Sequence, residues 1–124
     1  MNKTRIIYWA STAIVSLMML FTGFSYLTNE EMKQAFVQIG FPSFFRIELA
    51  VAKLVGGVLL LVPAVKGFAK QFVYVGFMIV LASAFLTHLA IGDTVSHSIM
   101  PLLFLGILIV SYVYYGKLAK PVTV

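Results

Sequence analysis

Four long apolar runs constrain this chain more than any other feature of its sequence. They cover residues 6–27, 44–63, 71–91 and 99–115 of the 124. Each is close to the roughly 20 residues that an α-helix needs to span a bilayer. Because 61% of the residues are hydrophobic and only 10% are charged, the chain cannot cover a soluble domain with polar surface. We predict an all-α integral membrane four-helix bundle, formed by residues 1–124 as a single four-span domain in the lipid bilayer.

The charges beside these runs indicate the topology of the chain. The net charge is +5, and most of the basic residues flank the runs, which is typical of topology signals and not of a surface that binds nucleic acid. One side of the predicted membrane holds six basic residues: Lys3, Arg5, Lys66, Lys70, Lys117 and Lys120. The other side holds Glu30, Glu31, Lys33 and Asp93. By the positive-inside rule, we expect both termini in the cytoplasm.

The first run could be a membrane helix or a cleavable signal peptide, since Lys3 and Arg5 precede it. The run is longer than the usual 7–15 apolar residues of a signal peptide, and no small-x-small motif ends it cleanly. We therefore expect a retained helix. One of its faces carries small, hydroxyl and aromatic residues: Thr12, Ser16, Met19, Gly23 and Tyr26. Such a stripe predicts a helix–helix seam in the membrane.

The segment between the first two runs is amphipathic. Thr28 and Glu31 have the spacing of a capping box, and Gly40 is a typical residue beyond a helix end. Apolar residues fall on one face between them: Met32, Ala35, Phe36 and Ile39. We predict a short helix over residues 29–39 in the membrane interface. It is either a plain connector or a lid over a site below it.

The second run carries three charged residues, Arg46, Glu48 and Lys53. A charge near the centre of a membrane helix costs about 2.5–3.5 kcal/mol on insertion scales, so these groups need partners. Arg46 and Lys53 are seven residues apart and share a face, whereas Glu48 and Lys53 are about 140° apart around the helix. We expect each charged group to reach a different neighbour. Ser43 is predicted to cap this helix, and Gly57 to allow a neighbouring helix to approach closely.

The last two runs carry fewer polar residues. A small-residue seam is predicted on the third run: Gly76, Ser83, Thr87 and Ala90. A polar loop is expected over residues 94–98, with His97 as a solvated loop residue and Pro101 in the first turn of the fourth helix. His88 and Asp93 are five positions apart, which leaves their direct contact open. The tyrosines near the end are typical of an aromatic belt: Tyr112, Tyr114 and Tyr115.

The outer half of the predicted bundle gathers most of the intramembrane polar residues. At about 1.5 Å of rise per residue, Glu48 lies level with His88 about one turn from the outer face, and Lys53 lies near the middle. The candidate ligand-binding residues are Glu48, Lys53, His88, Asp93, Tyr26, Thr22, Ser83 and Thr87. Because intramembrane ionisable groups tend to mark ligand sites, we predict an outward-facing polar pocket. The alternative is that the same groups are structural glue between helices.

The residue types limit the chemistry of such a pocket. The chain has no Cys, which excludes thiolate nucleophiles and thiolate metal sites. It also lacks a dinucleotide-binding fingerprint and a haem-ligand pair. We therefore expect no bound metal or nucleotide, and a redox role would need a diffusible cofactor such as a quinone. Lys53 or His88 would donate a hydrogen bond to a quinone carbonyl, and Glu48 would hold or relay a proton.

Four short motifs, in their order and spacing, resemble the DoxX-like family of small four-helix membrane proteins. They are Gly-Phe-Ser-Tyr-Leu at 23–27, Gly-Phe-Pro at 40–42, Lys-Leu-Val-Gly-Gly at 53–57 with the Leu-rich end at 59–63, and His88 with Gly92 and Asp93. The resemblance covers about residues 6–115. It implies a four-helix bundle in a bacterial inner membrane, with Lys53, His88 and Asp93 on a shared polar face.

Two functions follow from this resemblance and these residues. Some members of the family are linked to thiosulfate or quinone oxidoreductase complexes, which implies a quinone-binding role in a redox system. A distant animal relative is an assembly chaperone, which implies instead a non-enzymatic assembly factor or complex subunit with a membrane-protein partner or a second copy. A transporter is disfavoured, because four helices without repeats or broken spans do not form one unless they oligomerise. Enzymatic and non-enzymatic functions thus both stay open.

Overall fold

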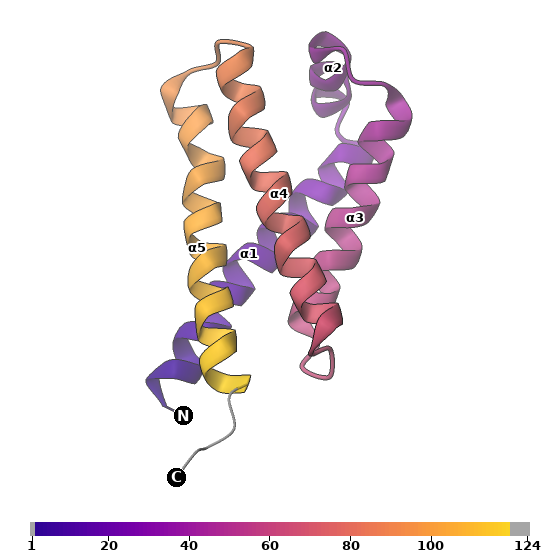
Figure 1. Ribbon diagram of the computed structural model, residues 1–124. Coiled ribbons are helices and arrows are strands. Elements are labelled where there is room, and N and C mark those ends of the chain that lie inside the picture. Colours follow the sequence, from indigo (N-terminus) through magenta and orange to yellow (C-terminus); the bar gives the residue numbers. More distant parts are fainter. Residues whose placement is uncertain (1, 120–124) are drawn as a thin grey trace. The chain divides into compact units, whose positions relative to one another are not determined.

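The computed structural model describes residues 2–119, so Lys120 of the predicted topology lies outside the described residues. The described chain folds into helices and contains no strand (Figure 1). The helices are α1 (Lys3–Thr28), α2 (Glu30–Ile39), α3 (Ser43–Leu61), α4 (Phe68–Ala90) and α5 (Val95–Ala119). The predicted all-α class is confirmed.

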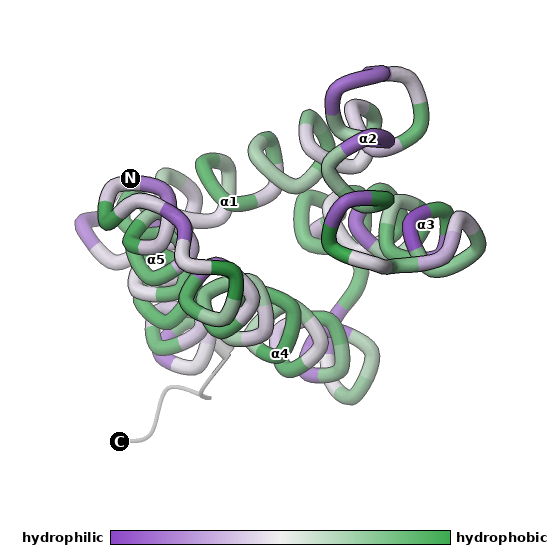
Figure 2. Tube along the Cα trace, turned by 90° about the horizontal axis from the view of Figure 1, so that it is seen from above, coloured by the Kyte–Doolittle hydropathy of each residue, from purple (hydrophilic) through white to green (hydrophobic). Residues whose placement is uncertain are grey.

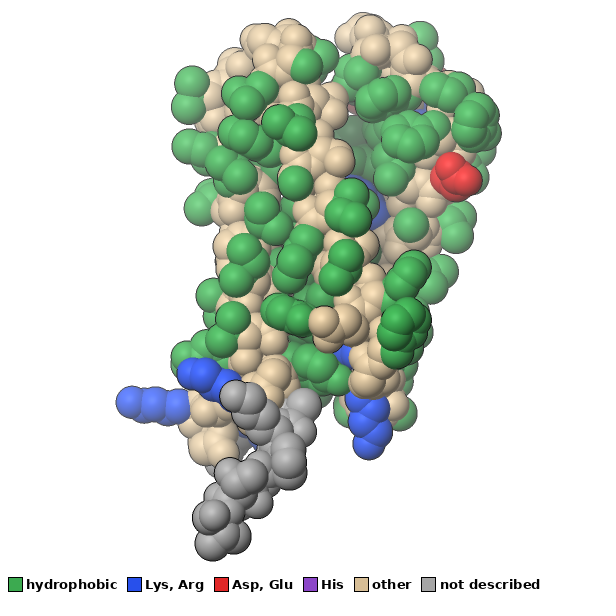
Figure 3. Space-filling model, viewed as in Figure 1, with side chains coloured by type: hydrophobic (Ala, Val, Ile, Leu, Met, Phe, Trp, Pro, Cys, Tyr) green, Lys and Arg blue, Asp and Glu red, His purple; other side chains and the backbone are tan. Residues whose placement is uncertain are grey.

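Within the described residues, three helices are long and apolar enough to cross a membrane: α1, α4 and α5. Figure 3 shows hydrophobic side chains over much of the face that it presents. α3 differs because three of its 19 residues are charged. α2 has only 10 residues, and hydrophilic positions colour much of it (Figure 2). Length and composition therefore make this a membrane protein, with α1, α4 and α5 as its clearest spans.

The chain divides into two compact units, which are described separately. One is formed by the described residues of Met1–Val15 and Tyr74–Val124, and the other by Ser16–Val73. The first unit thus holds the beginning of α1, most of α4 and all of the described part of α5. The second holds the remainder of α1, then α2, α3 and the beginning of α4.

In the second unit, α1 and α3 approach each other closely at two glycines. A Cβ added at Gly23 would lie 3.1 Å from the carbonyl oxygen of Ala50 and 3.2 Å from the Cβ of Lys53. A Cβ at Gly57 would lie 2.9 Å from Cγ of Leu20. A side chain at either position would press on the neighbouring helix, so the two glycines favour the close approach that is typical of membrane helices. The predicted seam on α1 and the predicted close approach at Gly57 are confirmed.

In the first unit, α1, α4 and α5 meet around buried hydroxyl groups. The hydroxyl of Ser111 lies 2.6 Å from that of Thr12 and 2.6 Å from that of Tyr74. The buried face of α4 is formed by large side chains: Val73, Tyr74, Phe77 and Leu81. The small-residue seam predicted for this helix is wrong, because a Cβ at Gly76 would meet nothing within 4 Å. The hydroxyl of Tyr74 instead links α4 to α5 through Ser111.

The capping chemistry differs from the prediction at the start of both α2 and α3. Asn29 caps α2, since its side chain accepts a hydrogen bond from the Met32 backbone N–H at 3.2 Å. Thr28 still belongs to α1, where its hydroxyl donates to the Phe24 carbonyl, so the predicted capping box is wrong. Ser43 is itself the first residue of α3 and forms no cap. Gly40 ends α2 with a φ of 99°, as predicted.

α5 begins four residues before the predicted start at residue 99, at Val95. Thr94 explains this early start, because its hydroxyl accepts a hydrogen bond from the His97 backbone N–H at 3.3 Å. His97 is therefore in the first turn of the helix and not in a loop. Pro101 lies inside the helix, beyond the first turn. There it lacks the N–H that would bond the His97 carbonyl.

Candidate functional site

Lys53 is the buried charged residue at the crossing of α1 and α3. Its side chain is 7% exposed. The ammonium donates hydrogen bonds to the hydroxyl of Tyr26 at 2.9 Å and to the hydroxyl of Thr22 at 3.3 Å. Thr22 and Tyr26 are four residues apart on α1, so both reach the same point on its surface. The structure thus brings together three of the residues predicted to bind a ligand.

Tyr26 also contacts both cations of α3 in other ways. The Lys53 Nζ lies 4.1 Å from the centroid of the Tyr26 ring, a cation–π distance. Arg46 donates a hydrogen bond to the Tyr26 backbone carbonyl. This carbonyl is in the last turn of α1, where carbonyl groups have no partner within the helix and attract cations. Arg46 and Lys53 therefore share a face, as predicted, and that face binds α1.

The hydrogen bonds of this group leave two donors unused. An ammonium has three N–H groups, and those of Lys53 donate to two hydroxyls in the described part of the chain. The Tyr26 hydroxyl accepts from Lys53, and its own proton has no acceptor among residues 2–119. The ion pairs found in this part of the chain do not include Lys53. One N–H of Lys53 and the phenolic O–H of Tyr26 thus have no hydrogen-bond acceptor among the described residues.

An aromatic row continues from Tyr26 into α2 and the start of α3. The Phe36 ring meets the Tyr26 ring edge-on at a centroid distance of 4.9 Å. Phe41 follows at 5.8 Å from Phe36, and Phe45 at 5.0 Å from Phe41. Phe36 is the buried residue of α2. Through it, α2 packs on the residue that also binds Lys53, so an apolar aromatic surface borders the two free donors.

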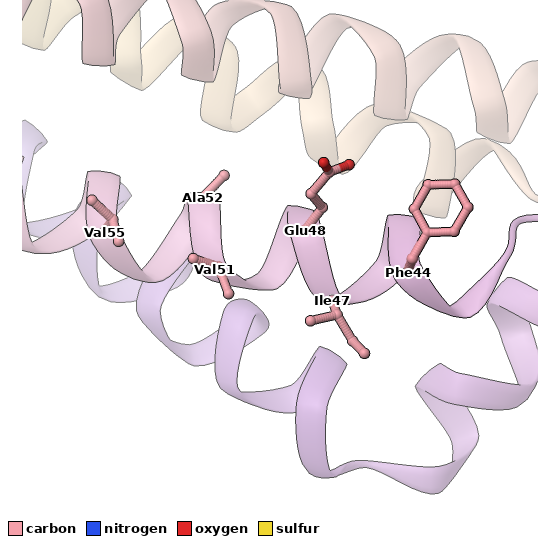
Figure 4. Close-up of a pocket in the computed structure, with 6 residues that line it drawn as sticks. All are labelled: Phe44, Ile47, Glu48, Val51, Ala52 and Val55. Atoms are coloured by element: carbon pink, nitrogen blue, oxygen red, sulfur yellow. The ribbon is translucent and has the colours of Figure 1, made fainter.

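Glu48 lies on a different face of α3 from Lys53, as predicted. It is exposed, in a shallow groove along the helix (Figure 4). The groove is lined by Phe44, Ile47, Glu48, Val51, Ala52 and Val55. Figure 4 shows Phe44, Glu48 and Ala52 leaving the same edge of α3. Within the described residues, the Glu48 carboxylate has no hydrogen bond or ion pair.

In the first unit, Asp93 joins two histidines at the turn between α4 and α5. The His88 Nδ1 lies 2.7 Å from one carboxylate oxygen of Asp93, and the His97 Nδ1 lies 3.3 Å from the other. The Thr94 backbone N–H donates to the same carboxylate at 2.8 Å. This N–H and the His88 ring lower the pKa of Asp93, so the carboxylate is ionised at neutral pH. The contact that the sequence left open is therefore present.

Ser83 and Thr87 do not extend this group of side chains. The Thr87 hydroxyl donates to the Ser83 carbonyl at 2.8 Å within α4, and Ser83 is exposed. The predicted common pocket of all eight residues includes members of both units and stays a prediction. Each unit brings together part of the set: Thr22, Tyr26 and Lys53 in one, His88 and Asp93 in the other.

A family model for the DoxX-like family matches residues 10–111. This chain belongs to the DoxX-like family. The match confirms the resemblance seen in the sequence and contains every candidate residue of both groups. No curated protein and no solved structure matches this DoxX-like chain.

Sequence reasoning missed two polar features of this DoxX-like protein. The first is the group of buried hydroxyls on Thr12, Tyr74 and Ser111. Sequence spacing could not pair them, because they are far apart in the chain. The second is Lys70, which the sequence analysis placed between the second and third apolar runs. It lies in the first turn of α4, is 1% exposed, and donates to the Leu60 carbonyl at 2.9 Å. A cation on the last turn of a helix is favourable, so Lys70 stabilises the end of α3.

Proposed function

We propose that this DoxX-like protein binds a quinone-like small molecule at Lys53, within the membrane, as part of a redox system. The observation that carries the proposal is the pair of free donors at the α1–α3 crossing. One is the remaining N–H of the buried Lys53, and the other is the phenolic O–H of Tyr26. A quinone presents a carbonyl oxygen that accepts from both. Its flat ring suits the aromatic row that begins at Tyr26 and Phe36.

The proposal includes α3 as a fourth membrane span. At 19 residues, it is about 28 Å long, close to the roughly 30 Å of the hydrocarbon core. Its cations have partners on α1, which offsets part of their cost in the membrane. Arg46 bonds the Tyr26 carbonyl, and Lys53 bonds two hydroxyls. On this arrangement α2, with its two acidic residues in the first turn, lies in the outer interface of a bacterial inner membrane, and both termini are cytoplasmic.

In this role the protein binds and orients the quinone, and a partner oxidoreductase supplies the electrons. Glu48 of α3 is the carboxylate nearest in sequence to Lys53 and has no partner among the described residues. Because Glu48 lies on a different face of α3 from Lys53, its carboxylate does not contact a quinone bound at Lys53, and we assign the proton transfer to the partner oxidoreductase together with the electrons.

A second function is supported by the same contacts. The bonds of Lys53 and Arg46 to Tyr26 tie α1 to α3, which is what structural glue in an assembly factor or complex subunit would do. That function predicts a stoichiometric membrane-protein partner after purification in mild detergent. A protein that purifies alone and still binds a quinone supports the first function.

A quinone titration tests the proposal. The protein in lipid nanodiscs is titrated with 2-methoxy-1,4-naphthoquinone, and binding is measured by equilibrium dialysis against empty nanodiscs. We expect saturable binding that Lys53→Met weakens at least tenfold, since a hydrogen bond from a charged donor is worth about 1.5–3 kcal/mol. Lys66→Met is the matched control, because Lys66 is exposed in the loop after α3. Equal binding by all three proteins would refute the proposal.

A further inference from the structure

The charges around Lys53 determine which form of a ligand this site prefers. We infer that the site selects the anionic form of its ligand, an ionised hydroxyquinone or quinolate, over a neutral quinone of the same shape. The inference rests on the proposed function and adds the chemical class of the ligand.

Within the second unit, the positive charges of Lys53 and Arg46 have no carboxylate partner. Among the described residues, the hydrogen-bond and ring contacts of Lys53 are with neutral groups: a phenol, a hydroxyl and an aromatic ring. Arg46, on the same face of α3, bonds a neutral carbonyl. The face of α3 that packs on α1 therefore presents two cations, and no carboxylate pairs with either among residues 2–119.

The acidic residues of this unit all lie away from Lys53. Glu48 is exposed on another face of α3. Glu30 and Glu31 are exposed at the start of α2, and Glu30 pairs with Lys33 at 3.9 Å. None of them supplies the counterion of Lys53.

Burial of the Lys53 ammonium strengthens its preference for an anion. A buried ammonium loses its hydration, and neutral dipoles return only part of the lost free energy. An anion adds a Coulomb attraction that a neutral carbonyl lacks, and this attraction is several times stronger in a protein interior than in water. Since the Tyr26 O–H is also free to donate, an oxyanion would receive two hydrogen bonds at once. Charge-assisted hydrogen bonds of this kind are about twice as strong as neutral ones.

Two probes of nearly equal shape test the inference. 2-Hydroxy-1,4-naphthoquinone is an anion at neutral pH, and 2-methoxy-1,4-naphthoquinone is neutral. Their Kd values are measured on the full-length protein in nanodiscs of zwitterionic lipid, each corrected for partition into empty nanodiscs. We expect the wild-type protein to bind the anion at least tenfold more tightly.

Variants then assign the preference to its residue. Lys53→Met should reduce the ratio of the two Kd values to about one, whereas Lys66→Met, with the same change of charge in an exposed loop, should keep it. Lys53→Arg, which retains the charge, should also keep it. The wild-type ratio needs no variant, so the inference stays testable if Lys53→Met does not fold.

The outcomes separate the inference from the proposed function. Equal binding of both probes by the wild-type protein overturns the anion preference and leaves the quinone site intact. Binding of neither probe overturns the proposed function itself. A preference for the anion that survives in a folded Lys53→Met variant overturns the assignment to Lys53.

Discussion

Replacing Gly23 by Ala should loosen the crossing of α1 and α3 and displace Lys53. The added Cβ would lie 3.1 Å from the Ala50 carbonyl oxygen, 3.1 Å from Cγ of Leu54 and 3.2 Å from Cβ of Lys53. Carbon atoms in contact prefer about 3.5–4.0 Å. The oxygen belongs to the backbone of α3, so the methyl group cannot be accommodated by turning a side chain, and the two helices must separate by a few tenths of an ångström.

The expected loss of stability is best stated as a difference from a matched control, Gly76→Ala. Overpacking costs about 1–3 kcal/mol, while Ala gains about 1 kcal/mol over Gly in helix propensity. Gly76→Ala makes the same chemical change in α4, where the new Cβ meets nothing within 4 Å. The propensity gain is common to both variants and cancels between them. Gly23→Ala should therefore be about 1–3 kcal/mol less stable than Gly76→Ala.

The free energy of unfolding and the quinone affinity can both be measured for the two variants. The free energy of unfolding is obtained from steric trapping in bicelles, and quinone affinity from dialysis in nanodiscs. We expect Gly23→Ala to lose stability relative to Gly76→Ala and also to bind more weakly, since the methyl group presses on the Lys53 Cβ. Equal stabilities of the two variants would refute the close approach of α1 and α3.

Three further predictions follow from the hydrogen bonds. Tyr26→Phe removes the acceptor of Lys53 at 2.9 Å and should cost about 1–3 kcal/mol of unfolding free energy, measured by steric trapping. Ser111→Ala leaves two buried hydroxyls without their shared partner; a loss of about 1–3 kcal/mol is expected, against less than about 0.5 kcal/mol for the exposed Ser83→Ala. The pKa of Asp93 is lowered in the folded state from its ordinary value of 3.8. Its carboxylate therefore adds stability above that pH, and this contribution is lost as the pH falls through the lowered pKa. The unfolding free energy of the wild-type protein should show this loss, and that of Asp93→Asn should not.

The helices could be predicted from the sequence, but the caps at which some of them start could not. Long apolar runs place a membrane helix with little ambiguity, because the bilayer sets the length. The start of a helix depends on one side-chain hydrogen bond. Thr94 accepts from His97 and so begins α5 four residues before the apolar run does. Asn29 takes the cap of α2 because Thr28 stays in α1 and bonds its carbonyl.

The sequence predicted which charged residues of α3 share a face, but not the side chains that they contact. Spacing placed Arg46 and Lys53 on one face of α3 and Glu48 on another, because helix geometry fixes those angles. Spacing could not show that the face with Arg46 and Lys53 meets Tyr26. The rotation of α3 against α1 is set by the contacts of Gly23 and Gly57.

The sequence did not show which tyrosines pack on one another. Tyr112 and Tyr115 were predicted in an aromatic belt at the membrane surface. Their rings lie 5.1 Å and 5.9 Å from the ring of the buried Tyr74. Tyr has an apolar body and a polar tip, so composition alone does not separate an interface position from a buried one that has found a hydroxyl partner.

A distance between Lys53 and a bound quinone tests the central claim most directly. Solid-state NMR dipolar recoupling in bilayers can measure it between lysine ¹⁵Nζ and a naphthoquinone labelled with ¹³C at its carbonyl carbons, with Lys53→Met identifying the Lys53 signal. A hydrogen bond of ordinary length to the carbonyl oxygen places the two nuclei about 4 Å apart. The account predicts dephasing at that distance in the wild-type protein and its loss in Lys53→Met. No dephasing of Lys53 in samples saturated with ligand would contradict it.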